Sequence, residues 1–181
     1  KLEKNSYFVV SAHREENIDL NDNFEVLTAS LNKVAEKYQK PIIFSTHPRT
    51  KNRIEKNKIK FNALIKNISP LGFFDYVNLQ KNAYVVLSDS GTISEESAMM
   101  GFPAVSIRTS TERPEAIDAG TVVLGGISTN EVLNAIEITK GLSVNEYSDL
   151  PWEYNVKNTS ERIVKVIQSY TSIVNKEIWD K

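Results

Sequence analysis

The sequence contains no cysteine, which excludes disulfide bonds, thiolate metal ligands and a cysteine nucleophile. The absence also fits a reducing compartment, so we expect a cytoplasmic location. Long hydrophobic runs are missing too. The longest apolar stretches reach about five residues, against the roughly 20 that a membrane-spanning helix needs, so we expect no membrane association.

Net charge is also nearly absent. The chain carries 22 Lys and Arg against 23 Asp and Glu, a formal net charge of −1 at pH 7, so no overall field attracts nucleic acid. An anionic ligand must therefore be held by local groups. Hydrophobic residues make up 40% and charged residues 25% of the 181 positions, which is typical of a compact globular domain.

Short apolar segments alternate with helical patterns along the whole chain. Several of these segments are continuously apolar, as strands buried on both faces of a parallel sheet are. We therefore predict a single domain over residues 1–181 with an α/β, Rossmann-like, doubly wound parallel sheet. The predicted strands are Tyr7–Ala12, Pro41–Ser45, Asn67–Pro70, Tyr84–Leu87, Ala104–Ile107 and Thr121–Leu124. The predicted helices include Asn21–Tyr38, Lys51–Lys60, Asp75–Asn82, Ile93–Met100, Asn130–Leu142 and a terminal helix over about 158–175.

The stretch from Tyr84 to Pro103 carries the main evidence in the sequence for a ligand-binding site. It reads as an apolar strand, a turn of small polar residues and a helix. In a parallel sheet such a turn lies at the carboxyl end of a strand, where ligands bind, and we expect the amides of Gly91, Thr92 and Ile93 to be unpaired. Those amides and the helix dipole favour an anion.

Two carboxylates, Glu95 and Glu96, follow in the first turn of that helix. A free phosphate does not need them, but a nucleotide or nucleotide sugar does, because amides donate to its phosphates while a carboxylate accepts from its hydroxyl groups. The alternative is a plain capping turn, with Ser90 as N-cap and the glutamates stabilising the helix dipole.

Other polar groups follow other predicted strands. Both histidines of the sequence, His13 and His47, stand just past a strand, and each has an arginine close behind. Two more arginines, Arg108 and Arg113, flank the loop after the fifth strand and can bind phosphate or carboxylate. These positions favour a site at one edge of the sheet, although such clusters also occur as solvated charge.

Aromatic side chains stand near the exit of the third predicted strand. Phe73, Phe74 and Tyr76 lie beside a glycine there and could stack on a nucleobase, or could simply pack.

Four ordered stretches together resemble one known family. They are Ser11-Ala12-His13-Arg14-Glu15-Glu16-Asn17, then Thr46-His47-Pro48-Arg49, then Ser88-Asp89-Ser90-Gly91-Thr92-Ile93-Ser94-Glu95-Glu96, then Thr111-Glu112-Arg113-Pro114-Glu115 with Ala119-Gly120-Thr121. This set resembles the C-terminal half of the non-hydrolysing UDP-N-acetylglucosamine 2-epimerases, nearly end to end.

The resemblance implies a glycosyltransferase-B type of fold with two Rossmann-like halves and the nucleotide sugar between them. This chain would be the nucleotide-binding half, and the N-terminal domain would be absent from it. The implied reaction is an isomerisation that inverts C2 of the sugar through elimination and re-addition of UDP. No cofactor and no obligatory metal are implied. The isolated half would be inactive, because the groups that move the C2 proton lie in the other half.

The resemblance also implies roles for individual residues. Ser90, Gly91 and Thr92 would hold the diphosphate, Glu96 would accept from the ribose hydroxyls, and Tyr76 would contact the uracil. His13 would act catalytically, together with Arg113, by offsetting charge on the departing phosphates. Supporting roles would fall to Arg14, Glu16, Asn17, Glu95 and His47.

Two positions depart from the common family pattern. Thr92 replaces a second glycine after the serine, and Glu15 stands where many members carry a second arginine. Both features resemble the relatives that form UDP-N-acetyl-L-fucosamine, so the sugar stays open. A glycosyltransferase-B sugar transferase and a non-catalytic UDP-binding module are the alternatives.

The family also implies several properties of the whole protein. It would be a cytoplasmic homodimer that serves capsule or other polysaccharide biosynthesis. The terminal helix would pack across onto the N-terminal domain.

Overall fold

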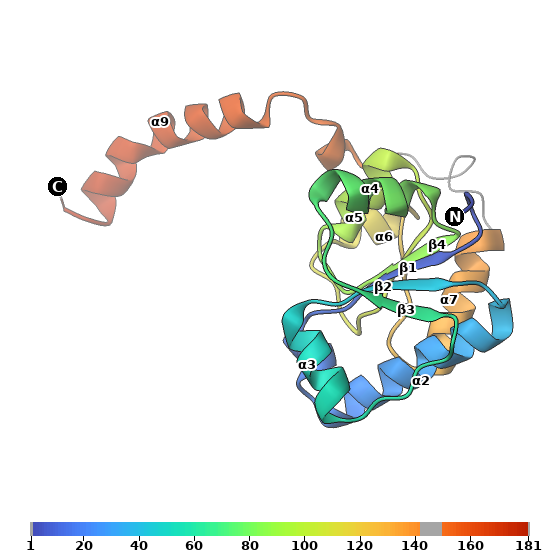
Figure 1. Cartoon of the computed structure of the whole chain (residues 1–181). Coiled ribbons are helices and arrows are strands. Elements are labelled where there is room, and N and C mark those ends of the chain that lie inside the picture. Colours follow the sequence, from blue (N-terminus) through green and yellow to red (C-terminus); the bar gives the residue numbers. More distant parts are fainter. Residues whose placement is uncertain (1, 142–149, 181) are drawn as a thin grey trace. The chain divides into compact units, whose positions relative to one another are not determined.

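The computed structural model describes residues 2–141 and 150–180 (Figure 1). The chain forms two compact units, Lys1–Pro151 and Trp152–Lys181.

The first unit is built on a six-stranded sheet in the order β3-β2-β1-β4-β5-β6, in which every pair is parallel. This confirms the predicted doubly wound sheet. The strands are β1 (Phe8–Ser11), β2 (Ile42–Ser45), β3 (Ile65–Ile68), β4 (Val85–Ser88), β5 (Ala104–Ser106) and β6 (Val123–Leu124).

The third strand begins earlier than the predicted Asn67–Pro70. Ile65 pairs with Ile42, and Ile68 pairs with Ser45. Between them Lys66 and Asn67 are exposed, as is usual on an edge strand. The apolar signal is therefore reduced to two isoleucines, which is why the sequence misplaces this strand.

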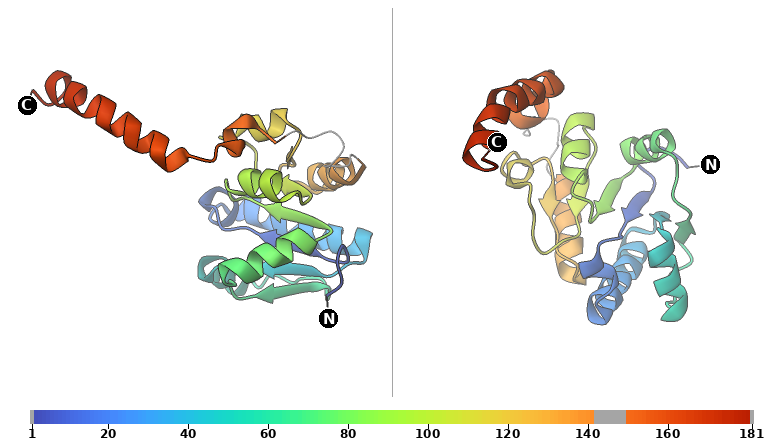
Figure 2. Two further views of the ribbon diagram at one scale, coloured as in Figure 1. Left: turned by 90° about the horizontal axis from the view of Figure 1, so that it is seen from above. Right: turned by 90° about the vertical axis from the view of Figure 1, so that its left-hand side faces the viewer.

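Helices cover both faces of the sheet (Figures 1 and 2). One face carries α2 (Asn21–Tyr38), α3 (Pro48–Lys56) and α7 (Thr129–Gly141), and the other carries α4 (Phe73–Asn82), α5 (Ile93–Met100) and α6 (Pro114–Asp118). A short helix, α1 (Glu15–Ile18), follows β1. The predicted end of α7 at Leu142 lies outside the described residues.

Two apolar cores flank the central strand. Phe8 and Val10 point into the core shared with α2 and α7. Tyr7 and Val9 point the other way, into the core that includes Ile93 of α5. Alternate residues of β1 are thus buried on opposite faces, which explains its continuous apolar sequence.

The second unit contains a 3₁₀ turn, η1 (Trp152–Asn155), and the helix α9 (Thr159–Glu177). The helix confirms the predicted terminal element and extends it slightly. Along it Ile163, Ile167, Tyr170 and Ile173 recur at helical spacing on one face. Among the described helices of both units, none combines the length and apolarity needed to cross a bilayer.

Candidate functional site

A row of serines marks the carboxyl edge of the sheet. Ser11 of β1 is in register with Ser45 of β2 and Ser88 of β4, and Ser88 is in register with Ser106 of β5. The connections from β1 lead to helices on one face and those from β4 to helices on the other, so the boundary between these strands is the switch point of the fold. The sequence-predicted motifs follow β1, β4 and β5 at this edge.

Asp89 is the hub that joins these loops. Its side chain is fully buried, and it accepts hydrogen bonds from the amide of His13 at 3.0 and 3.1 Å, the amide of Arg14 at 3.0 Å and Asn17 Nδ2 at 3.1 Å. The imidazole Nδ1 of His13 lies 3.3 Å from Asp89 Oδ1. Asn17 Nδ2 also donates to the carbonyl of Ile107, so the loops after all three strands are connected.

The turn after Asp89 presents backbone donors. Within the described residues, no protein acceptor pairs with the amides of Gly91 and Thr92, as the sequence predicts. The expectation for Ile93 is wrong, because its amide donates to the carbonyl of Ser90 at 3.3 Å and closes the turn. A Cβ built on Gly91 would lie 3.5 Å from Arg14 Nη2, so a guanidinium lies beside this turn.

Thr92 fits the turn without strain. Its φ is −67°, in the right-handed helical region, so the position does not require the glycine that is common in the family. The side chain makes contacts that a glycine could not make. Its hydroxyl lies 3.0 Å from the hydroxyl of Ser90 and donates to Glu96 Oε1 at 2.9 Å. Ser90 is thus not the N-cap, which is Thr92, and no side-chain capping bond is formed there.

The two adjacent glutamates of α5 have different partners. Glu95 Oε1 accepts from Arg113 Nε at 2.6 Å, so its charge is neutralised by a cation. Glu96 instead accepts from neutral donors, the hydroxyl of Thr92 and, through Oε2, Gln80 Nε2 at 2.7 Å. Glu96 is therefore the carboxylate with charge left for a hydroxyl-bearing ligand.

Gln80 was missed by the sequence reasoning. It lies one helical turn after Tyr76 on α4, so the two side chains share a face of that helix. The four-residue spacing from Tyr76 is the sequence feature that could have placed Gln80 near the site.

Arg108 is buried among carboxylates rather than open to phosphate. Its side chain is 4% exposed, and it contacts Glu16 Oε1 through Nε at 3.1 Å and both oxygens of Glu112 at 2.6 and 2.9 Å. The hydrogen bonds from Arg108 lower the pKa of Glu112 from 4.5 to about 2. Arg14 Nη1 approaches the same carboxylate at 3.4 Å, so the network joins the loops after β1 and β5.

Tyr76 is packed against the core on the α4 side of the sheet. Burial raises the pKa of its hydroxyl to about 12, while a hydrogen bond with Ser11 acts in the opposite direction. The hydroxyl is therefore protonated at neutral pH and lies near the end of β1. The neighbouring Phe73 and Phe74 are 72% and 84% exposed and contact each other edge to face.

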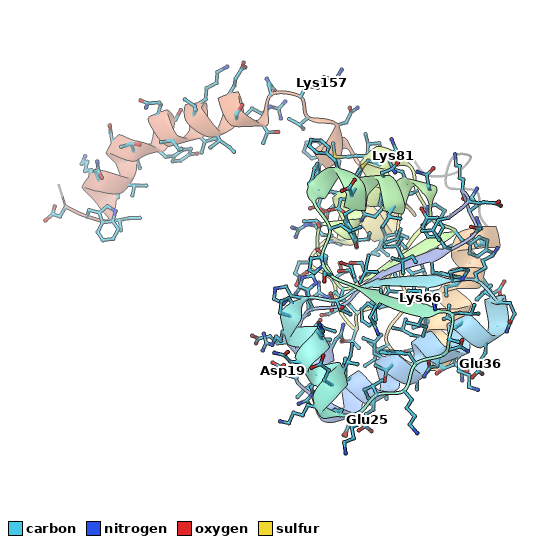
Figure 3. All side chains as sticks on the ribbon, in the orientation of Figure 1. Asp19, Glu25, Glu36, Lys66, Lys81 and Lys157 are labelled. Atoms are coloured by element: carbon cyan, nitrogen blue, oxygen red, sulfur yellow. The ribbon has the colours of Figure 1, made fainter. Side chains whose placement is uncertain are left out.

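The second histidine lies apart from this network. His47 precedes α3, where its Nδ1 accepts from the amide of Arg49 at 3.4 Å. Arg49 pairs with Glu15 and with Asp19, whose label stands beside α3 in Figure 3. Across residues 2–141 and 150–180, no hydrogen bond or ion pair joins His47 to the Asp89 hub.

The assembled site can bind an anion beside a hydroxyl-bearing group. The unpaired amides of the turn and the guanidinium of Arg14 can bind the anion. Glu96, one helical turn away, can accept hydrogen bonds from the hydroxyl groups. In the part of the chain that the structure describes, no cluster of three or more His, Cys, Asp or Glu side chains is suited to a metal ion.

Comparison with known proteins gives a consistent result. The family model described as UDP-N-acetylglucosamine 2-epimerase matches residues 1–168. A UDP-N-acetylglucosamine 2-epimerase of Methanococcus maripaludis is 37% identical over 175 residues, which cover 92% of this chain and 46% of the relative.

Solved structures agree. The UDP-N-acetylglucosamine 2-epimerase from Rickettsia bellii superposes with a TM-score of 0.84 at 36% identity, covering 99% of this chain and 48% of that one. The Methanocaldococcus jannaschii UDP-GlcNAc 2-epimerase in complex with UDP-GlcNAc and UDP gives a TM-score of 0.81 at 34% identity. The match covers 90% of this chain and 45% of that one. The chain thus spans less than half the length of these relatives.

Proposed function

The chain belongs to the UDP-N-acetylglucosamine 2-epimerase family, and from this premise we propose that it is the UDP-binding half of an isomerase that inverts C2 of a UDP-2-acetamido sugar. The substrate would be UDP-N-acetylglucosamine and the product UDP-N-acetylmannosamine. The other half of the cleft would come from an N-terminal domain.

The observation that carries this proposal is the arrangement at the start of α5. The amides of Gly91 and Thr92 have no protein acceptor among the described residues, while Glu96, one helical turn later, is held by neutral donors. Phosphate oxygens suit the first pair and ribose hydroxyls suit the carboxylate. Open amides occur at every helix start, but a plain capping turn would not need a carboxylate anchored at both oxygens.

The proposed reaction divides between the two halves. A base in the other half would remove the C2 proton, and the bond between C1 and the phosphate oxygen would break to leave a 2-acetamidoglucal and UDP. UDP would then add back to C1 as a proton is delivered to the opposite face of C2. No redox carrier is needed, because no electrons leave the sugar.

This half would stabilise the charge that develops on UDP. The amides of Gly91 and Thr92, the hydroxyl of Ser90 and the Arg14 guanidinium beside the turn would meet the diphosphate. His13 suits an electrostatic role because its imidazole is 47% exposed while Nδ1 approaches buried Asp89.

Two further residues complete the proposed nucleotide contacts. Arg113 would lie near the phosphates as the partner of Glu95. Tyr76 would contact the uracil with a protonated hydroxyl, since its pKa is raised to about 12 by burial.

The sugar has a second candidate, UDP-N-acetyl-L-fucosamine as product. Thr92, which resembles the relatives that form it, makes a bond to Glu96 that glycine could not make. For the whole protein we infer a cytoplasmic homodimer in polysaccharide biosynthesis, with α9 packed onto the N-terminal domain through its apolar face.

Calorimetric titration of the chain with UDP, UMP and uridine tests the proposal. UDP should bind most tightly, because both turn amides act on the diphosphate, and Glu96→Ala should weaken UDP roughly tenfold or more through loss of charged hydrogen bonds. Glu95→Ala is the matched control and should change UDP affinity less than about threefold, because one oxygen of its carboxylate is paired with Arg113 and the other is buried.

Equal losses in both variants would mean that the two glutamates serve only the helix dipole. Equal affinities for uridine and UDP would contradict the proposal that the turn amides bind the diphosphate.

A further inference from the structure

Gln80 is a buried polar side chain that lies between α4 and the first turn of α5. It is 1% exposed, and its Nε2 donates to Glu96 Oε2 at 2.7 Å. A buried amide is costly unless its groups are hydrogen-bonded, so its contact with a proposed ligand-binding carboxylate needs a physical reason.

The orientation of the amide indicates that reason. A carboxylate can only accept, so Gln80 must turn its NH₂ group toward Glu96. Its Oε1 is then buried without a hydrogen-bond partner among the described residues. A glutamine that served packing alone would direct this oxygen to a donor. Gln80 instead leaves its own acceptor unsatisfied while it holds Glu96.

The carboxylate is fixed at both oxygens. Thr92 Oγ1 donates to Oε1 at 2.9 Å, and Gln80 Nε2 donates to Oε2. Each carboxylate oxygen offers about two acceptor positions, so one remains open on each. Two open positions on neighbouring oxygens match two adjacent hydroxyl groups, such as those of a ribose.

We propose that Gln80 is a positioning residue that, through its hydrogen bond to Glu96 Oε2, orients this carboxylate toward the ribose diol and sets the preference for a ribonucleotide over a 2′-deoxyribonucleotide. The inference rests on the proposed function, in which Glu96 accepts from the ribose. Gln80 itself does not touch the ligand.

Titration of the 181-residue chain with UDP and with 2′-deoxyuridine diphosphate tests this role. The unaltered chain should prefer UDP roughly tenfold or more, as expected for a hydrogen bond to a charged acceptor. Gln80→Met keeps the side-chain volume but cannot donate. It should reduce the preference to about threefold or less, because UDP loses contacts at both ribose hydroxyls whereas 2′-deoxyuridine diphosphate has only the 3′-hydroxyl contact to lose.

Two further variants make the result specific. Leu79→Met, the neighbouring position on α4, alters packing without touching the Gln80 bond and should retain the full preference. Thr92→Val removes the other donor to Glu96 and should also reduce the preference.

Three results would contradict the proposed role of Gln80 or the proposed function on which it rests. If Gln80→Met weakens both nucleotides equally, Gln80 has only a structural role and the proposal is wrong. If Gln80→Met and a second variant, Gln80→Leu, both fail to fold by circular dichroism, the role is likewise structural. If the unaltered chain binds no UDP, the proposed function itself fails.

Discussion

The exits of β1 and β2 are neighbours in the sheet, and each places a histidine after the strand, but their surroundings differ. After β1, His13 lies against the buried carboxylate of Asp89. After β2, His47 caps α3, and the nearby Arg49 pairs with exposed Glu15 and Asp19. We call the first region the hub edge (residues 13, 14, 16, 17, 89–92 and 108–113) and the second the open edge (residues 46–49 together with Glu15 and Asp19, the partners of Arg49).

The difference follows from strand order. At the switch point β1 is paired with β4, so the loop after β1 meets a loop that carries a buried carboxylate. β2 is paired on its other side with β3, which is followed by Ser69 and Pro70 and offers no charge. Equivalent places in the sequence pattern thus acquire different chemistry from the strand beside them.

The largest predicted effect is the loss of the hub carboxylate. Asp89→Ala should lower the free energy of unfolding by about 3 kcal/mol or more, because the amides of His13 and Arg14 lose their acceptor inside the protein and Asn17 Nδ2 loses one of its two acceptors. Urea unfolding measures it, with exposed Asp118→Ala as the matched control. A loss no larger than that of the control would mean that the hub edge is no more constrained than the open edge.

The next largest effect separates the two histidines. In a protein extended upstream to contain both halves, His13→Ala should lower turnover roughly tenfold to a hundredfold, with a smaller change in UDP affinity, because its role is proposed to grow as charge develops on UDP. His47→Ala is the control and should leave turnover within about twofold. Coupled turnover assays and calorimetry measure the two quantities. Equal turnover losses would contradict the distinction between the edges.

The sequence was sufficient for the sheet and for the edge at which the candidate site residues lie. Continuous apolar strands and the turn chemistry of residues 88–91 predict a doubly wound sheet with ligand groups at its carboxyl edge. Boundaries were less secure where the signal is weak, as at β3, whose two exposed polar residues hide the strand.

The contacts between motifs were beyond the sequence. No local pattern says that Asp89 reaches the amide of His13, 76 positions away, or that Glu96 bonds to Gln80 of another helix. Such pairs depend on which loops the strand order brings together. For the same reason Arg108, which looks open to phosphate from its loop position, turns out to be buried among carboxylates.

The smallest predicted effect compares an ion pair from each edge. Glu112 contacts Arg108, whose side chain is 4% exposed, whereas Glu15 contacts Arg49, whose side chain is 46% exposed. Glu112→Gln should lower the melting temperature more than Glu15→Gln at neutral pH, because exposed ion pairs contribute little.

The pH dependence sharpens this contrast. The folded pKa of Glu112 is lowered from 4.5 to about 2, so its stabilising contribution is complete above 4.5 and is lost as the pH falls toward about 2. Glu112→Gln has no such proton to gain, so its melting temperature should approach that of the unaltered protein as the solution is acidified through this range. Melting curves recorded between about pH 7 and about pH 2 measure this convergence. The same convergence for Glu15→Gln would contradict this contrast. It would mean that an ion pair with the buried guanidinium of Arg108 stabilises the fold no more than one with the exposed guanidinium of Arg49.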